Sequence, residues 1–469
     1  MTIEQILALI ASKDSKNIEE AVKQLKGVTK EIKIDEIRNQ LDPMEHKVMK
    51  VTHRPNKKIK KTPTSPESEE LVARVPLALQ KLIVERAVGF TFGFNPKIKA
   101  EPNGDIEIAL LNAFKDVLNV TKSNSLNGDL ATDLYSCTQV AEMWFGVELK
   151  EKQKIYGFDS DFKLKNAIFS PLRGDNLYPL YDDFGDMVAF SRSFTVDNID
   201  GRKTYFTTYT ETNIIKFDIT SGIILIENVE NKLGKIPIVF ATQPNVEWYL
   251  VQTVIERLEL LMSNFADTND YNGSPILFGK GSLGSAPTKG STGKFITGQG
   301  QDADLKYVSW EQAPESIRLE IEKLYEVVYG FTQTPNISFE MVKGIGTTSG
   351  IALKLLFMDA HLKVQAKRRI WDTYFIRRAN IIKEWLCIFN PIFLPAKNMF
   401  IELEIVPYTI VDYAELYGYL TAANGGLPVI AHDTSIQMTG EVDDVVGEME
   451  KIKLSLKEQA TVNAFPENQ

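Results

Sequence analysis

Residues 245–332 constrain the fold most, because two amphipathic stretches there flank a glycine-rich segment. After Pro244, apolar residues recur at steps of three and four, which places them on one face of an α-helix. This stripe consists of Trp248, Val251, Ile255, Leu258, Met262 and Phe265, and it is widened by Leu250, Val254 and Leu261. From about residue 315 a second helix follows, with the stripe Ile317, Ile321, Leu324 and Val328. The polar sides of both helices are mainly acidic.

Six glycines lie within residues 281–302, between two short strand-like pieces, PILFGKG and LKYVSW. The pattern therefore predicts that the chain leaves as a helix, forms a small β module and returns as a second helix. An exposed apolar stripe on such a pair needs a partner, and a neighbouring subunit is the simplest one. We expect the assembly stripe to consist of Trp248, Val251, Ile255, Leu258, Met262, Ile317, Ile321 and Leu324.

The segments before this pair divide by their hydrophobic period. Residues 1–75 are typical of an arm with two short helices, at about 3–12 and 17–26, and its basic cluster, which contains Arg54, is expected to be solvated or to contact a phosphate or a partner. Residues 76–148 have helical spacing, including DLATDLYSCTQVAEMWFG. Between about 150 and 240, β-branched and aromatic runs separated by turn residues predict an antiparallel sheet.

A long helix is predicted from about Ser349 to Phe389, and its charge is opposite to that of the chain. It carries eight basic and three acidic residues, whereas the whole 469-residue chain has a net charge of −9. A solvated face with internal ion pairs and a contact surface are both compatible with this charge. A strand, MFIELEIVPY, and two helical segments, DYAELYGYLTAANGG and DDVVGEMEKIKLSLKEQ, follow.

The stretch GIGTTSGIALKLLFMD, residues 344–359, has the glycines and hydroxyl residues of a phosphate-binding loop. A P-loop also needs a lysine directly after its last glycine, and none stands there. The chain has no GxGxxG in a βαβ context, no GxSxG, and only four scattered histidines without metal-ligand spacing. We therefore predict no catalytic residues, no metal, no cofactor and no enzymatic activity.

Composition limits the remaining choices. At 469 residues the chain is expected to form two to four structural units. Its only two cysteines, Cys137 and Cys387, are far apart, which argues for a reducing compartment without disulfides. There is no apolar run of transmembrane length, and the N-terminus has no signal-peptide pattern, so no membrane association is expected. A negative net charge disfavours non-specific DNA binding through the whole surface.

Three stretches, in this order, resemble the portal proteins of tailed bacteriophages of the siphophage type. They are PNVEWYLVQTVIERLELLMSNFADTNDYNGSPILFGKG, TPNISFEMVKGIGTTSGIALKLLFMDAHLKVQAKRRIWDTYF and GGLPVIAHDTSIQMTGEVDDVVGEMEKIK. The likeness extends over about residues 76–455, and SGIALK before the long helix is its most specific part.

The resemblance implies an α+β, mainly helical, portal-type fold. Its parts would be an N-terminal arm (1–75), a wing (76–244, with the long helix and strand at 350–408), stem helices (245–270 and 313–332), a small α/β clip (271–312), a tunnel loop (333–349) and a helical crown (409–469). It also implies a DNA-channel loop made of Lys343, Gly344, Ile345, Gly346, Thr347 and Thr348.

The function implied is a dodecameric ring at one capsid vertex of the virion, assembled in the host bacterial cytoplasm. Double-stranded DNA would pass through its channel during packaging and ejection. The partners implied are the terminase large subunit, the head–tail adaptor, and the major capsid and scaffolding proteins. An acidic stem would have the right sign for a channel in which DNA must slide.

Some alternatives stay open. For Lys363, Lys367, Arg368 and Arg369 we favour pairing with the acidic surface of a neighbouring subunit over contacts to DNA phosphates. The competing functions are another ring-forming or scaffold-like structural protein, and a nucleic-acid-processing enzyme.

Overall fold

The computed structural model describes all of the chain except twelve short stretches, and its contacts divide it into two compact units. The described residues are 1–27, 32–59, 67–199, 201–272, 276–283, 298–308, 313–337, 355–409, 413–425, 428–440, 442 and 445–463. The first unit comprises Met1–Asn336 and Asp359–Tyr408. The second comprises Ile337–Met358 and Thr409–Gln469.

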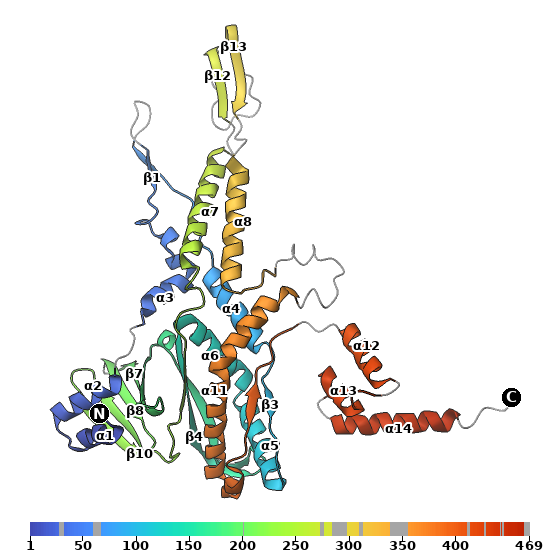
Figure 1. The fold of residues 1–469 in the computed structure, drawn as a ribbon. Helices are drawn as coiled ribbons and strands as arrows, with labels where there is room; N and C mark the ends of the chain where they lie inside the picture. Colours follow the sequence, from blue (N-terminus) through green and yellow to red (C-terminus); the bar gives the residue numbers. More distant parts are fainter. Residues whose placement is uncertain are drawn as a thin grey trace, which may run out of the picture. The chain divides into compact units, whose positions relative to one another are not determined.

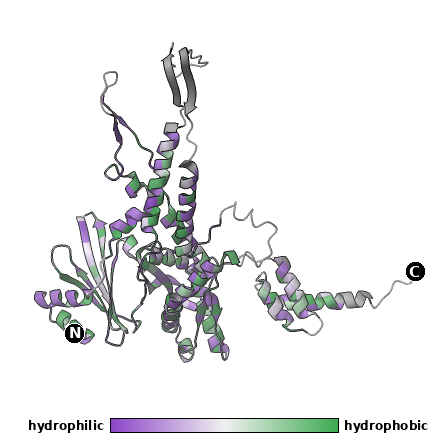
Figure 2. Cartoon of the chain, turned by 45° about the horizontal axis from the view of Figure 1, so that its top comes forward, coloured by the Kyte–Doolittle hydropathy of each residue, from purple (hydrophilic) through white to green (hydrophobic). Residues whose placement is uncertain are grey.

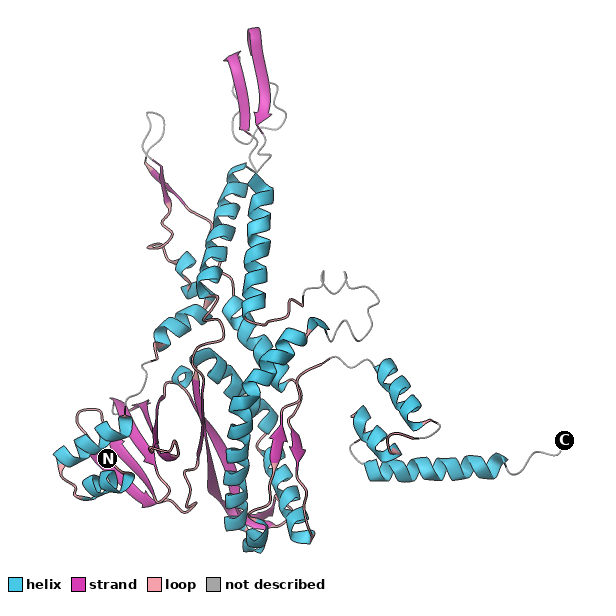
Figure 3. Cartoon of the chain, viewed as in Figure 1, coloured by secondary structure: helices cyan, strands magenta, loops and turns pink. Residues whose placement is uncertain are grey.

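The first unit contains helices and strands, whereas the described part of the second unit contains helices only (Figure 3). The helices of the first unit are α1 (Ile3–Ala11), α2 (Ser15–Lys26), α3 (Ile34–Leu41), α4 (Leu79–Phe92), α5 (Asp105–Val120), α6 (Ser123–Cys137), α7 (Gln252–Asn272), α8 (Ala313–Phe331) and α11 (Met358–Phe389, from Asp359 on). Short 3₁₀ turns are η1 (Pro43–Glu45), η2 (Lys47–Met49), η3 (Pro171–Arg173) and η4 (Pro391–Ala396). The helices of the second unit are α12 (Tyr413–Asn424), α13 (His432–Thr439) and α14 (Val445–Asn463).

All strand pairs among the described residues are antiparallel. The β-branched runs at about 150–240 predict one antiparallel sheet, and the strands there form two. Five strands form one sheet in the order β10 (Ile224–Glu230), β9 (Asn213–Asp218), β8 (Gly201–Tyr209), β7 (Met187–Asn198) and β6 (Asn176–Tyr181). Three form a second sheet in the order β11 (Ile238–Thr242), β4 (Gln139–Lys154) and β5 (Asp159–Phe169). The two-stranded pairs are β1 (Lys57–Ile59) with β2 (Ser68–Glu70), β3 (Lys97–Lys99) with β14 (Glu402–Glu404), and β12 (Ile276–Leu283) with β13 (Gly298–Val308).

The described residues of the arm expected at 1–75 belong to the first unit and pack against its other elements. A capping box between Thr2 and Gln5 starts α1, and the Asp14 side chain caps α2. The apolar faces of both helices cover one face of the five-stranded sheet, where Phe206 and Phe217 are fully buried (Figure 1). The solvated reading is wrong for Arg54, which is 8% exposed and paired within the chain.

Two further expectations need correction. Helical spacing continues through AEMWFG, yet the helix ends at Cys137 and β4 begins at Gln139. Thr138 makes the break in a left-handed conformation with φ of 68°, a position that usually favours glycine and is therefore hard to read from the sequence. In the second unit, α13 forms within the segment expected only to join two helices.

The predicted helix pair and β module are present among the described residues. α7 and α8 run side by side in opposite directions, and both carry hydrophobic and hydrophilic residues along their length (Figures 1 and 2). Between them in the chain, β12 and β13 form an antiparallel hairpin. The long helix α11 ends at Phe389 as predicted, and residues 349–354 of its expected start lie outside the described part.

Candidate functional site

The apolar stripe of α7 is buried within its own chain. Trp248, Val251, Ile255 and Leu258 are each 0% exposed, although Trp248 and Val251 precede the helix proper. Met262, Ile317, Ile321 and Leu324 are half-buried. The expectation that the whole stripe is exposed and awaits a neighbouring subunit is therefore wrong for its first four members, because intrachain packing already covers them.

A polar stripe on α7 binds the N-terminal segment of the same chain. Its members are Glu256, Glu259, Ser263 and Asp267, which recur at steps of three and four and so share one face. Lys47 Nζ lies 2.9 Å from Glu256 Oε2, and Arg54 Nη2 lies 2.7 Å from Asp267 Oδ2.

Backbone N–H groups complete the contact. Ala73 N donates to Asp267 Oδ1 at 2.6 Å, Val75 N to Ser263 Oγ at 2.9 Å, and Leu77 N to Glu259 Oε1 at 2.8 Å. The acidity of α7 that the sequence shows is thus largely compensated by cations and N–H donors of its own chain.

His46 is held between two acceptors in the middle of this contact. Its Nδ1 lies 2.5 Å from Glu259 Oε1, and its Nε2 lies 2.9 Å from the Gln40 carbonyl oxygen. Burial lowers the pKa of His46, but the hydrogen bond and charge of Glu259 outweigh it, so the pKa is raised above 6.5. The geometry favours the doubly protonated ring, because both nitrogens face oxygen acceptors.

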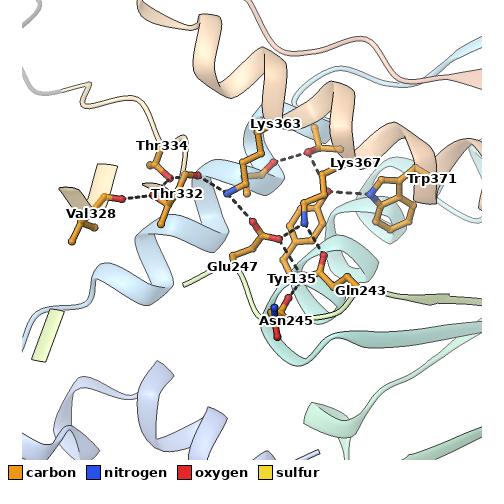
Figure 4. A network of polar contacts seen from close by, with 12 residues as sticks. Tyr135, Gln243, Asn245, Glu247, Val328, Thr332, Thr334, Lys363, Lys367 and Trp371 are labelled. Atoms are coloured by element: carbon orange, nitrogen blue, oxygen red, sulfur yellow. Dashed lines mark hydrogen bonds and ion pairs between the residues drawn. The ribbon is translucent and has the colours of Figure 1, made fainter. Parts of the chain in front are cut away.

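Glu247 forms the centre of a second, more deeply buried cluster at the base of the helix pair (Figure 4). It precedes α7 and accepts from two lysines of α11: Lys363 Nζ at 2.7 Å from Oε2, and Lys367 at Oε1. Lys363 also donates to the carbonyl oxygen of Thr332, directly after α8, at 2.9 Å. Lys367 also donates to Gln243 Oε1 at 2.7 Å and lies 4.8 Å from the centre of the Tyr135 ring.

The electrostatics of this cluster follow from two ammonium groups facing one carboxylate. Burial opposes ionisation of Glu247, but the charges of Lys363 and Lys367 outweigh it and lower its pKa. For Lys363, burial is the stronger influence, and its pKa is lowered despite Glu247. The cluster joins the chain before α7, the chain after α8 and α11 at a single point.

The sequence interpretation of the basic residues on α11 is corrected by these contacts. Lys363 and Lys367 pair with Glu247 of their own chain, so they are not available to a neighbouring acidic surface or to DNA phosphates. Arg368 lies 3.4 Å from Glu404 and 3.7 Å from Asp372, again within the chain. Arg369 alone of the four is exposed.

Arg378, one of the basic residues of the predicted long helix, is a buried charge. Its guanidinium donates to both carboxylate oxygens of Glu142 on β4, at 2.6 and 2.8 Å, and to Asn127 Oδ1 at 2.6 Å. A charged residue at a helix position says nothing of a distant partner, so no local signal identifies this pair.

The remaining predicted site lies outside the described residues. This applies to Lys343, Gly344, Ile345, Gly346, Thr347 and Thr348. Ahead of them, Gln333, two residues after the end of α8, has a left-handed conformation with φ of 50°, and Arg86 donates to the carbonyl oxygen of Pro335. The approach to the predicted loop is therefore fixed up to Pro335.

The described residues contain no group of three or more His, Cys, Asp or Glu side chains placed to hold a metal ion. In the same part of the chain, no helix is both long and apolar enough to cross a bilayer. Cys137 and Cys387 are buried and not bonded to one another. The ion pairs of Arg54, Glu247 and Arg378 each join different segments of the chain. Together they form a structural framework around the α7–α8 pair.

Comparison with known proteins identifies the family. The family model described as "Phage portal protein, SPP1 Gp6-like" matches residues 16–462. The chain therefore belongs to this family of phage portal proteins, as the resemblance of its three motifs predicts. This family is structural, and membership implies a ring-forming oligomer in a phage particle.

Two other comparisons add no support. No curated protein matches the chain. A chain from the solved structure described as "Neck of empty GTA particle computed with C6 symmetry" is 11% identical, covering 77% of this chain and 88% of that one, with a TM-score of 0.36.

Proposed function

We propose that this chain is the subunit of a twelve-membered ring at one capsid vertex, whose axial channel conducts double-stranded DNA during packaging and ejection. The observation that carries the proposal is the portal family match over residues 16–462. The chemistry of the chain is compatible with it, because a ring that guides DNA needs a rigid framework, and the energy for transport comes from a separate ATPase, the terminase.

The parts of the chain take the following roles in this proposal. The wing is 76–244 with 350–408, the stem is 245–270 and 313–332, the clip is 271–312, the tunnel loop is 333–349 and the crown is 409–469. The clip binds the terminase large subunit and later the head–tail adaptor. Capsid and scaffolding proteins surround the ring at the vertex.

Within the stem, we assign the channel surface to α8 rather than α7. The polar stripe of α7 is covered by the N-terminal segment of the same chain, so its carboxylates are not offered to DNA. On α8 the side chains of Glu315, Glu322 and Glu326 are 79%, 55% and 64% exposed. Arg318 and Lys323 offset only part of this charge. A weakly acidic wall repels phosphates and keeps DNA from adhering.

Electron microscopy of the purified chain tests the proposal. We expect closed rings with an axial hole, and twelve subunits on symmetry analysis. Filaments, or monomers both in solution and when co-expressed with capsid and scaffolding proteins, would contradict the ring. Robust ATP hydrolysis or DNA cleavage by the pure chain would instead favour an enzyme.

The loop at residues 343–348 is proposed to contact the passing DNA. Replacing Gly344 and Gly346 by valine is expected to spare ring formation and to reduce DNA packaging or retention. Gly128→Val on α6 is the matched control, since an added Cβ there meets open space. If the double variant forms no rings, these glycines serve folding or assembly rather than DNA handling.

A further inference from the structure

A wide groove lies beside the start of α7, between α3 and the end of β11. Its volume is about 950 Å³, and it is mainly apolar. Ile37 of α3 lines one side, and Trp248, Tyr249 and Leu250 line the other. The groove is outside the Glu247 cluster, although Gln243 contributes to both.

Tyr249 and Leu250 are held in position but not covered. They are 61% and 68% exposed, whereas their neighbours Trp248 and Val251 are fully buried. Trp248 Nε1 donates to Gln40 Oε1 at 2.8 Å, and Glu247, one residue earlier, is fixed by two lysines. Two large apolar side chains presented by a rigid turn lose little conformational freedom on binding, which makes them suitable anchors for an interface.

The opposite wall of the groove is α3, an amphipathic helix whose apolar face is only partly buried. The apolar residues Ile34, Ile37 and Leu41 of α3 are spaced by three and four, yet α3 has no fully buried residue. A helix of eight residues depends on packing of its apolar face for stability. This face is therefore incompletely satisfied in one copy of the chain.

The charge of the lining distinguishes between classes of partner. Among the described residues of the lining, Lys33 and Glu36 are the charged ones, and they offset one another. Binding to nucleic acid would need a basic lining. A neutral apolar groove instead fits the core of a permanent protein interface.

We propose that this groove receives a neighbouring copy of the same chain, with Leu250 and Tyr249 as the anchors of the contact. The inference rests on the proposed ring. In a closed ring each subunit contacts its two neighbours through two different faces, so one face of each subunit must bind the other face of the next subunit. The first four residues of the stripe that the sequence suggested for this role are fully buried within the chain. Tyr249 and Leu250 lie among these residues in the sequence but are 61% and 68% exposed.

The experiment compares Leu250→Asp with Leu394→Asp, a similarly exposed leucine on η4 that does not line the groove. Mass photometry over a dilution series measures the concentration at which rings form. We expect Leu250→Asp to raise that concentration at least tenfold, and Leu394→Asp to leave it unchanged. Equal assembly of Leu250→Asp and the unmodified chain would overturn the groove inference while leaving the ring intact.

A second measurement does not depend on the stability of the aspartate variant. The native cysteines are buried, so Leu250→Cys introduces the thiol that a maleimide can reach, with Leu394→Cys as its control. Ring formation is expected to slow labelling at position 250 and not at position 394. Unchanged labelling at both positions in assembled rings would contradict the proposal. Absence of rings from every variant and from the unmodified chain would reject the proposed ring and, with it, the groove contact.

Discussion

Arg378 of α11 and Glu142 of β4 form an ion pair with two hydrogen bonds, and both side chains are 0% exposed. The Asn127 side chain takes a third guanidinium hydrogen bond. The pair joins α11, which also carries Lys363 and Lys367, to β4 of the three-stranded sheet. It therefore fixes the position of α11 relative to that sheet.

Breaking this pair is expected to be costly. Arg378→Met leaves Glu142 as a buried charge without its partner, and a loss of about 3–5 kcal/mol in the free energy of unfolding is expected. Denaturant unfolding measures it. Arg202→Met is the control, because the Arg202 and Asp197 side chains are 78% and 90% exposed and such pairs contribute about 0–1 kcal/mol. Equal losses in the two variants would contradict the assigned role of burial.

The Glu247 cluster predicts an asymmetry between its members. Glu247→Gln leaves two buried ammonium groups without a counter-charge, whereas Lys367→Met leaves a balanced pair of Lys363 and Glu247. We expect a loss of about 3–5 kcal/mol for Glu247→Gln and a clearly smaller one for Lys367→Met. Urea unfolding at neutral pH gives both values. A larger loss for Lys367→Met would mean that its bond to Gln243 and its contact with Tyr135 matter more than charge balance.

His46 predicts a dependence of stability on pH. Its pKa is raised in the folded chain, so its contribution is fully present below the unfolded value of 6.5 and is lost as the pH rises through the folded value. The stability advantage of the unmodified chain over His46→Gln should therefore be greatest below pH 6.5 and shrink in alkali. Thermal unfolding from pH 5.5 to 9 measures it. His53→Gln, which removes an exposed imidazole from the same segment, is the control.

Arg54 predicts a change in local stability of the N-terminal segment. Arg54→Met removes donors to Asp267, Asn264 and the Ala73 carbonyl oxygen, so cleavage by trypsin between residues 47 and 74 should become several-fold faster. Lys57→Met is the comparison, because Lys57 lies 3.9 Å from the same Asp267 and is 55% exposed. Each variant removes one trypsin site, which keeps the comparison fair. Equal rates in the two variants would show that Arg54 does not hold the segment.

Charge on α8 predicts an effect on DNA passage. Glu322→Lys combined with Glu326→Lys places cations on the proposed channel wall, so the amount of DNA packaged per particle should fall several-fold while rings still form. Glu19→Lys, at an exposed position of α2, is the control. Normal packaging by the double variant would remove α8 from the channel surface.

Local patterns predicted the helix pair, the β hairpin between its helices and the antiparallel strands, because period and turn residues are properties of neighbouring residues. Local patterns did not predict which part of the protein buries an apolar stripe or pairs with a charged residue. The stripe at Trp248 and Ile255 has the same spacing whether its own chain or another subunit buries it. Likewise, the sequence does not show whether Lys363 and Arg378 are solvated or buried. Only the folded structure shows that they pair with Glu247 and Glu142.

The contacts of Lys363 also have a topological consequence. Its ammonium group touches both Glu247, where the chain departs into α7, and Thr332, where it comes back from α8 (Figure 4). The two ends of the segment that runs through α7, the β12–β13 hairpin and α8 therefore meet at the Lys363 side chain. A segment whose ends are neighbours can change in length or content without altering the framework that holds it. The far part of this segment, around β12 and β13, can therefore differ in length or sequence without moving the elements that Lys363 joins.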